Sequence, residues 1–474
     1  MSGRMRIAIV HGYFLADSGS GIYVRELAKA FTVLGHDVTL VCQEKTPEKY
    51  DFIDAAFALD SDNHNVTTIF ERTRQYAGSC RCVRPDIHGL LLTYVASGDK
   101  SFENHTFQDA SPDKIDAYLK DNITALSTIF KLWSPDAVQA NHAIMQPYEV
   151  REALQAAGLE EVPFTMTIHG SALNFSLKAD SRLLTYFVAA ARDARAITAL
   201  SESSVADVVD FAAAAGADIS GKTLVIPPGV DTTLFRPLPH VNARKQTVGV
   251  FAGRLLWTKG PQYAIAALPL ILRDNPDFEL WLAGDGPLEP GLRRLIELLS
   301  AGDITGAAAY AKEAPEMGEE GAWGPVIPDI KRLDGAAYSA AAKGMDKRVM
   351  FLGHLAHDEM APAFAGADVA LMPSVYPEAY GLSAIEAAAA GAVPIATYQT
   401  GLRTPLDILA AELGDPALTR LLPDGELTRG LAAAVTRALA VYETQEPGHR
   451  QRLHEAAKRE FSWESAALAY LAAF

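Results

Sequence analysis

Short apolar runs and stretches of helical periodicity alternate along the chain. Residues 6–10 and 37–41 predict two buried strands. A helix between them is predicted by apolar residues at helical spacing, namely Val24, Leu27, Ala28, Phe31 and Leu34. The loop before this helix, residues 11–21, contains three glycines. Strand, loop, helix and strand in this order are typical of a parallel α/β sheet.

The same alternation continues to about residue 231. Three more strands are predicted at residues 136–141, 163–168 and 195–201. Ser201 is placed to cap the helix that follows the last of them. Residues 222–231 begin as a strand and then contain two prolines and a glycine, which interrupt regular structure. We therefore expect an interdomain linker at about residues 237–245.

A second α/β pattern begins with a strand at residues 247–252 and a loop at 253–260. Pro261 suits the first turn of the next helix, where its missing N–H is not needed. Further strands are predicted within residues 278–286, 348–353, 368–374 and 392–397. Residues 300–346 are rich in Ala and Gly, and we expect an insertion there with helix at 307–313 and 335–342.

Length, charge and cysteine content restrict the class of protein. The 474 residues suit two domains of about 200 residues each. A formal net charge of −16 argues against broad binding to nucleic acid or anionic membranes. No apolar run approaches the roughly 20 residues of a transmembrane helix, and no signal sequence precedes the first strand. Three cysteines provide no disulfide framework, so we expect a cytoplasmic protein. We also expect a monomer or a homodimer.

The richest motif lies at residues 376–391, between two predicted strands. Glu378 is expected in the loop and Glu386 in the first turns of the following helix, so that both carboxylates can face one crevice. Gly381 permits backbone conformations that other residues resist, and Ser383 is expected to help cap the helix. Free N–H groups at a helix start bind anions. Carboxylate acceptors beside such a site suit a ligand with hydroxyls and phosphates, as in a sugar nucleotide.

Cations and a histidine occupy comparable positions elsewhere. Arg254 and Lys259 flank the loop that starts at Gly253, and two fixed cations over a crevice stabilise a diphosphate, most of all as it departs. His169 follows a predicted parallel strand and therefore points toward the crevice where such sheets bind ligands. Near the first helix, Ser18 and Gly19 belong to a glycine-rich turn.

These motifs together resemble the retaining GT-B glycosyltransferases of family 4. The resemblance rests on Glu378-x7-Glu386 within its strand–loop–helix–strand, the Gly-Arg-(x)4-Lys-Gly loop at residues 253–260, and Thr-x-His ending at His169. It implies two doubly wound Rossmann-like domains facing across a cleft. Residues 1–236 would form the acceptor domain and 246–455 the donor domain, with the insertion at 300–346. Residues 456–474 would form a helix that packs back on the first domain.

The resemblance also implies roles for residues. Arg254 and Lys259 would hold the donor diphosphate, Glu378 the sugar hydroxyls and Glu386 the ribose, while His169 would position the sugar. The remaining substrate-binding positions would be Gly19, Gly253, Tyr380, Gly381, Leu382 and Ser383. A UDP-sugar is favoured because UDP is the commoner nucleotide in the family. Front-face transfer to a hydroxyl acceptor is expected, without a metal or other cofactor and without nucleic acid or an integral membrane segment.

Three alternatives stay open. A GT-B sugar-nucleotide epimerase shares the fold but needs its own acid–base groups. A nicotinamide-dependent dehydrogenase opens similarly, yet the first loop lacks G-x-G-x-x-G. A non-catalytic sugar-nucleotide binder would retain the phosphate residues and lose His169 or Glu378, both of which are present.

Overall fold

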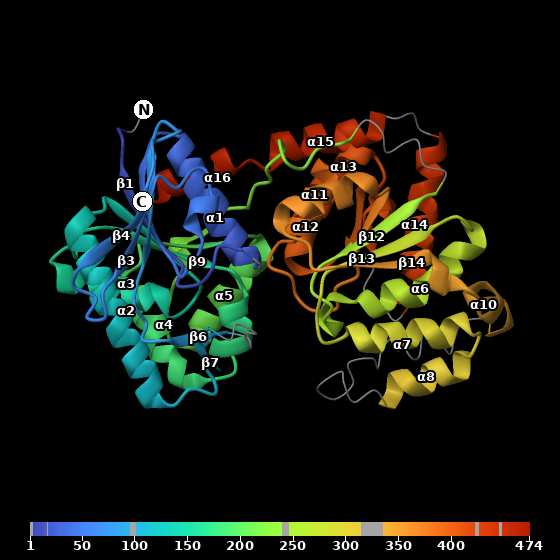
Figure 1. Cartoon of the computed structure of the whole chain (residues 1–474), viewed down its shortest axis with the longest axis horizontal. Helices are drawn as coiled ribbons and strands as arrows, with labels where there is room; N and C mark the ends of the chain where they lie inside the picture. The colour runs from blue at the N-terminus through green and yellow to red at the C-terminus, as the bar shows by residue number, and fades with distance from the viewer. Residues whose placement is uncertain are drawn as a thin grey trace. The chain divides into compact units, whose positions relative to one another are not determined.

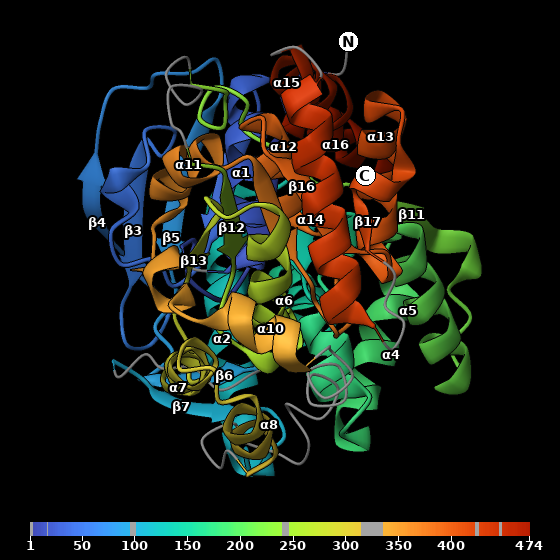
Figure 2. The same cartoon turned by 90° about the vertical axis from the view of Figure 1, so that its right-hand side faces the viewer.

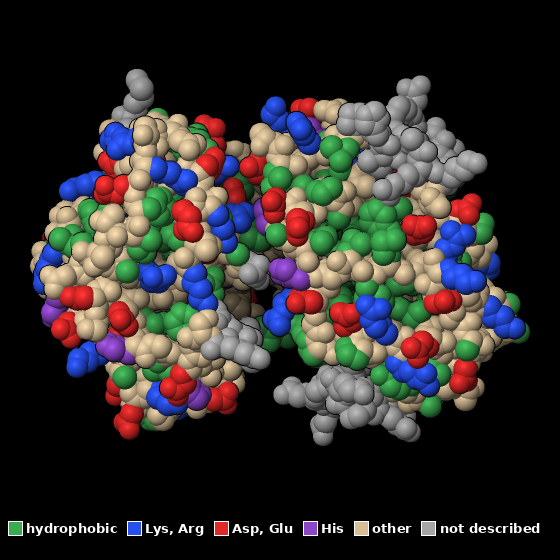
Figure 3. All heavy atoms as spheres, viewed as in Figure 1, with side chains coloured by type: hydrophobic (Ala, Val, Ile, Leu, Met, Phe, Trp, Pro, Cys, Tyr) green, Lys and Arg blue, Asp and Glu red, His purple; other side chains and the backbone are tan. Residues whose placement is uncertain are grey.

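The computed structural model describes residues 3–16, 18–94, 101–238, 246–313, 335–421, 426–444 and 448–474. The chain divides into two compact units. Unit 1 comprises residues 1–229 and 463–474, and unit 2 comprises residues 230–462. The chain therefore leaves unit 1, forms unit 2 and returns for one helix (Figure 1). On the face that Figure 3 shows, acidic and basic side chains are interspersed over each unit.

Unit 1 is built on a nine-stranded sheet with the order β11-β10-β9-β8-β1-β2-β5-β3-β4. Every neighbouring pair is parallel except β3 and β4. The strands are β1 (Arg6–Val10), β2 (Asp37–Val41), β3 (Ala55–Leu59), β4 (Val66–Glu71), β5 (Ser79–Arg84), β8 (Ala137–Asn141), β9 (Phe164–Ile168), β10 (Ala196–Ala199) and β11 (Thr223–Val225). A separate parallel pair joins β6 (Leu90–Thr93) to β7 (Glu103–Thr106). The central strands β8 and β9 are buried along their whole length, and β1 is buried except at its first residue.

Helices cover this sheet, and serine side chains cap three of them. Ser18, Ser111 and Ser201 accept hydrogen bonds from backbone N–H groups in the first turns of α1, α2 and α5. The helices are α1 (Gly19–Val33), α2 (Pro112–Trp133), α3 (Gln146–Ala157), α4 (Leu184–Asp193), α5 (Glu202–Ala214) and α16 (Trp463–Ala473). Helix α16 packs against α1 within unit 1.

Unit 2 has a six-stranded, wholly parallel sheet with the order β14-β13-β12-β15-β16-β17. Its strands are β12 (Val248–Ala252), β13 (Glu279–Ala283), β14 (Val349–Gly353), β15 (Val369–Met372), β16 (Val393–Thr397) and β17 (Arg420–Leu421). Its helices are α6 (Pro261–Asp274), α7 (Glu289–Ser300), α8 (Ile304–Glu313), α10 (Gly335–Ala342), α11 (His357–Gly366), α12 (Leu382–Ala389), α13 (Arg403–Leu413), α14 (Leu427–Thr444) and α15 (Gly448–Glu460). Helices α6 and α14 pack side by side (Figure 2). None of the helices in the described residues is long and apolar enough to cross a membrane.

Several boundaries differ from the sequence-based expectations. Helix α1 begins at Gly19 rather than at Ile22, because Ser18 caps it and the glycines form its first turn. Strands β3 to β7 and helix α2 lie in a region whose pattern predicted no particular element. In the expected insertion, α8 starts three residues early and α10 lies as predicted, while residues 314–334 fall outside the described residues. Most of the expected linker at 237–245 also falls outside them.

Candidate functional site

The candidate site in unit 2 lies where the connections of its sheet diverge. β12 and β15 are neighbours, and the chain leaves them toward opposite edges of the sheet. Ligands of doubly wound sheets bind at this position, beyond the carboxyl ends of the strands. Loop 253–260 follows β12 and loop 373–381 follows β15. Two hydrogen bonds join these loops, because the carbonyl of Thr258 accepts from the Val375 N–H and from the Ser374 hydroxyl, each at 2.9 Å.

Lys259 and Glu378 form an ion pair between the two loops. Nζ of Lys259 lies 2.6 Å from Oε1 of Glu378, and the Ser374 hydroxyl donates to the same oxygen at 2.8 Å. The Glu378 backbone is also held, since its N–H donates to Thr400 Oγ1 and its carbonyl accepts from the Gly401 N–H, both at 3.0 Å. The Lys259 and Glu378 side chains are 39% and 21% exposed, so a ligand can reach the pair.

Arg254 belongs to the same loop as Lys259 but is exposed. Its backbone carbonyl accepts from the Leu256 N–H at 2.8 Å, but within the described part of the chain its guanidinium has no hydrogen bond or ion pair. The loop is hydrogen-bonded to the turn that follows β13, because the Leu255 N–H donates to the Asp285 carbonyl at 2.7 Å. A Cβ atom at Gly284 would lie 1.9 Å from the Gly253 carbonyl oxygen, so the two turns pack backbone against backbone. The structure thus presents one paired and one unpaired cation on a rigid loop.

Helix α12 begins at the end of the second loop. Gly381 precedes it with a φ of +97°, and a Cβ atom there would lie 2.3 Å from Cδ2 of Leu402. The expectation that Ser383 helps cap this helix is wrong, because Ser383 is already the second helical residue and no side chain caps the start. The N–H groups of Leu382 and Ser383 therefore have no partner within the helix. Tyr380 is buried beside this turn, and burial raises the pKa of its hydroxyl.

Glu386 lies on α12 but has a different partner from Glu378. Its Oε1 is 2.9 Å from Nε2 of His357, the first residue of α11, and only 8% of the residue is exposed. The Phe235 ring packs edge-on against His357 with ring centroids 5.1 Å apart. The structure therefore pairs Glu378 with Lys259 and Glu386 with His357.

In unit 1, three histidines follow three adjacent strands. His11 comes directly after β1, His142 after β8 and His169 after β9. The rings of His11 and His142 stack with centroids 5.4 Å apart, and the His169 ring lies 5.0 Å from His142 at an interplanar angle of 58°. Burial lowers the pKa of His11 to about 4 and that of His169 to about 3, so both rings are neutral near pH 7. Among the described residues, no three His, Cys, Asp or Glu side chains are arranged to hold a metal ion.

His169 and Gly19 occupy defined positions in unit 1. Nε2 of His169 lies 2.8 Å from Oδ1 of Asn141, and the Tyr23 ring packs edge-on against the imidazole at 5.0 Å. Gly19 is the first residue of α1, where Ser18 Oγ accepts from the Gly21 N–H at 3.0 Å. The predicted residues of unit 1 thus lie at a helix start and at the end of a strand.

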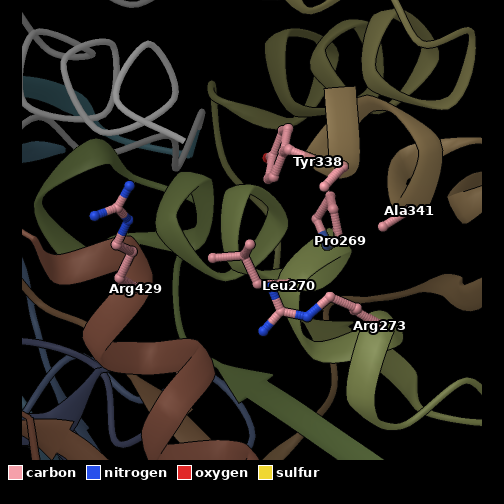
Figure 4. Close-up of a pocket in the computed structure, with 7 residues that line it drawn as sticks. Pro269, Leu270, Arg273, Tyr338, Ala341 and Arg429 are labelled. Carbon is pink, nitrogen blue, oxygen red and sulfur yellow. The ribbon is translucent and has the colours of Figure 1, made fainter. Parts of the chain in front are cut away.

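One cavity in unit 2 contains none of the predicted residues. It has a volume of about 200 Å³ and lies between α6, α10 and α14 (Figure 4). Its lining residues are Pro269, Leu270, Arg273, Ala337, Tyr338, Ala341 and Arg429. The Tyr338 hydroxyl already has a hydrogen-bond partner, since it donates to the Ala266 carbonyl at 2.7 Å. The α6 residues that line the cavity lie in the second half of that helix, away from the loop 253–260 at its start, so we do not assign this cavity to the candidate site.

Two family models match different parts of the chain. The model described as Glycosyltransferase Family 4 matches residues 18–234, and the model described as Glycosyl transferases group 1 matches residues 328–440. The matched ranges together include more than half of the chain. The chain belongs to the family 4 glycosyltransferases. This membership was predicted from the loops at 253–260 and 376–391 and is confirmed.

Curated relatives agree with the family assignment. A D-inositol 3-phosphate glycosyltransferase from Geodermatophilus obscurus is 29% identical over 260 residues, which cover 53% of this chain and 47% of that protein. A glycogen synthase of Mycobacterium tuberculosis is 26% identical over 72% of this chain and 70% of its own length. The alignment with the inositol phosphate enzyme therefore spans only about half of that relative.

Solved structures match over nearly the full length. Anabaena HepE, solved in complex with UDP and glucose, has a TM-score of 0.60 and 16% identity, and the match covers 99% of each chain. Sucrose-phosphate synthase from Thermosynechococcus elongatus has a TM-score of 0.58 and 19% identity, with 99% and 98% covered. At such identities the likeness shows the fold, and the predicted GT-B class of two Rossmann-like α/β domains is confirmed.

Four polar residues next to the predicted ones were missed. His11 and His142 each directly follow a predicted strand, as His169 does, so their positions in the sequence could have identified them. Asn141 and His357 gave no such signal. Their partners His169 and Glu386 are 28 and 29 positions away, and only the folded chain brings them together.

Proposed function

We propose that this protein is a retaining glycosyltransferase that moves a sugar from a nucleotide-diphosphate sugar to a hydroxyl acceptor. The bond between the anomeric carbon and the diphosphate breaks, a bond to the acceptor oxygen forms on the same face, and the acceptor proton passes to the departing phosphate. The curated relatives named above carry glycosyl-transfer activities in their names. Fold alone does not decide activity, so the proposal depends on the site in unit 2.

The observation that carries the proposal is the Lys259–Glu378 pair with the unpaired Arg254 on the same loop. A diphosphate leaving group gains negative charge as its bond to the sugar breaks. Two cations on a rigid loop stabilise that charge more in the transition state than in the ground state, which is the requirement for catalysis. The N–H groups of Leu382 and Ser383 at the start of α12 add a further anion site.

Carboxylates and histidine have complementary roles in this proposal. Glu378 is held by Lys259 and Ser374, and its remaining acceptor capacity suits the hydroxyls of the donor sugar. Glu386, fixed by His357, suits the ribose hydroxyls. His169 in unit 1 positions the sugar. Gly19, Gly253, Tyr380 and Gly381 shape the surrounding backbone rather than supply charge.

UDP is the proposed nucleotide, and no metal is required for the step. Solved relatives of this fold have been obtained with UDP and with UDP-glucose, which supports UDP here. Arg254 and Lys259 provide the positive charge that a divalent cation would otherwise supply to the diphosphate. Residues 1–236 would bind the acceptor and 246–455 the donor.

A thermal-shift panel tests the donor site. UDP, GDP, ADP and their sugars are each added to the wild type, to Arg254→Met and to Lys259→Met, with Mg²⁺ and with EDTA. A ligand at 100 times its Kd stabilises the folded state by about 2.7 kcal/mol, so a specific nucleotide raises the Tm measurably. Each charge-assisted hydrogen bond is worth about 1.5–3 kcal/mol, and we expect each variant to weaken binding by roughly 10- to 100-fold.

Arg294→Met is the matched control, because Arg294 is an exposed arginine on α7 whose partner is Glu297. It should bind the nucleotide as the wild type does. Equal stabilisation of Arg254→Met and wild type would contradict the assigned diphosphate site. A shift produced only by nicotinamide dinucleotides would contradict the transferase altogether. Turnover is then measured as UDP release with a panel of hydroxyl acceptors, and the anomeric configuration of the product by NMR tests retention.

A further inference from the structure

Asn141 is held in one orientation at the end of β8. Its side-chain Nδ2 donates to the Val10 carbonyl at 3.0 Å and to Oε1 of Gln139 at 2.8 Å. A backbone carbonyl can only accept, so the nitrogen of the Asn141 amide must face Val10. The opposite side of the amide is therefore its oxygen. This oxygen, Oδ1, is the atom that lies 2.8 Å from Nε2 of His169.

This orientation fixes the proton on His169. An amide oxygen only accepts hydrogen bonds, so the short contact requires a proton on Nε2. A neutral imidazole carries one ring proton, which leaves Nδ1 as an acceptor. The rings of Tyr23 and His142 pack against the imidazole. Burial lowers the pKa of His169, and repulsion from His11 lowers it further. Within the described residues, no group donates a hydrogen bond to Nδ1.

A buried polar chain holds Asn141 from the other side. Gln139 Nε2 donates to Thr167 Oγ1 at 2.6 Å, and this hydroxyl lies 2.7 Å from the hydroxyl of Tyr470. Tyr470 belongs to α16 and is fully buried, as are Gln139 and Thr167. Its hydroxyl also lies 3.0 Å from Thr198 Oγ1. The amide at position 141 is thus the end of a network that extends across the sheet to α16.

We propose that Asn141 is a positioning residue that holds His169 in the Nε2–H form and so presents Nδ1 as a hydrogen-bond acceptor. Through Nδ1, a ring in this state accepts a hydrogen bond from a hydroxyl or an amine and does not donate one to a phosphate oxygen. The group that His169 meets is then a hydroxyl of the sugar or acceptor, and the diphosphate is bound elsewhere. Only this last step rests on the proposed function; the assignment of the tautomer rests on the contacts of Asn141.

Long-range ¹H–¹⁵N spectra of the histidine side chains test the tautomer directly. The protein is labelled with ¹⁵N-histidine, and the His169 signals are assigned by their loss in His169→Gln. We expect wild-type His169 to show a protonated Nε2 and an unprotonated Nδ1 at pH 7. In Asn141→Leu the ring loses its acceptor and should show both tautomers. Asn122→Leu is the control, because Asn122 is also a buried asparagine but donates to the Tyr118 carbonyl within α2, and His169 should be unchanged.

Either of two results overturns the proposal. One is a wild-type His169 with its proton on Nδ1 or with a charged ring at pH 7; the other is an unaltered His169 pattern in folded Asn141→Leu. If Asn141→Leu does not fold, the wild-type spectrum still decides, and Gln139→Met provides the second variant with an expected smaller change. Where turnover is measurable, Asn141→Leu should lower kcat/KM about tenfold while UDP affinity stays the same. If the wild type does not bind UDP, that result contradicts the proposed function and leaves the assignment of the tautomer unaffected.

Discussion

Replacing Gly381 by alanine is the most direct test of how the donor loop is built. Gly381 has a φ of +97° and immediately precedes α12, whose first N–H groups belong to the proposed anion site. Alanine at this φ is disfavoured by about 1–2 kcal/mol, because Cβ approaches the carbonyl oxygen that follows. The new Cβ would also lie 2.3 Å from Cδ2 of Leu402, which is 1% exposed and cannot move into solvent. Such overpacking costs about 1–3 kcal/mol.

The two contributions can be separated within unit 2. Gly414, at the end of α13, has a φ of +72°, and a Cβ atom there would meet nothing within 4 Å. Gly414→Ala should therefore lose about 1–2 kcal/mol from the backbone alone, whereas Gly381→Ala should lose about 2–5 kcal/mol. The difference of about 1–3 kcal/mol measures the packing against Leu402.

Urea unfolding followed by circular dichroism and tryptophan fluorescence measures both losses, with each transition fitted separately because the chain has two units. Thermal melts should show about 2–4 °C per kcal/mol. The double variant Gly381→Ala with Leu402→Ala should recover part of the packing cost, which a double-mutant cycle detects as coupling. Equal losses in Gly381→Ala and Gly414→Ala would refute the argument that Leu402 requires a glycine here.

Two further predictions concern pH. The pKa of His11 is lowered to about 4 by burial, so the folded state binds fewer protons than the unfolded state between pH 6.5 and 4. Stability is therefore lost as the pH falls through this window, at about 1.4 kcal/mol per pKa unit. Urea midpoints measured at pH 7 and 4.5 should show a smaller loss for His11→Gln than for the wild type. The pKa of Glu149 is raised to about 8 by burial, so the folded state keeps a proton that the unfolded state releases, and stability falls as the pH rises from about 4.5 to 8. Glu149→Gln should therefore gain stability relative to wild type between pH 5 and 8, and parallel unfolding curves for the two proteins would contradict this.

The strands around the two sites were predictable because they are buried on both faces. β1 contains a short apolar run, β8 and β9 alternate apolar residues with buried polar ones, and each of the three strands is followed directly by a histidine. Strands β3 to β5 were not predicted. In β4 most side chains are partly or fully exposed, so its sequence lacks the continuous apolar signal. Helix α2 has alternating charged and apolar residues in a region that begins with polar loops, and its period was overlooked.

Residue types at the site were more predictable than their partners. Lys259 and Glu378 were each predicted as ligands for parts of the donor, but their ion pair joins positions 119 apart and depends on how β12 and β15 pair. Ser383 failed as a cap because Gly381, with its left-handed backbone, already occupies the position that precedes the helix. Local sequence predicts chemistry well, whereas which side chain meets which requires the sheet register.

The return of the chain to unit 1 has a consequence for biosynthesis. Residues 463–474 are made after the whole of unit 2, although they pack on α1. Until then the emerging chain lacks the Tyr470 hydroxyl that contacts Thr167 and Thr198. Unit 2 is one continuous stretch and can fold first, whereas unit 1 has to wait with an uncovered helix and an incomplete polar network. Unit 1 can therefore be completed only after the whole of unit 2 has been synthesised.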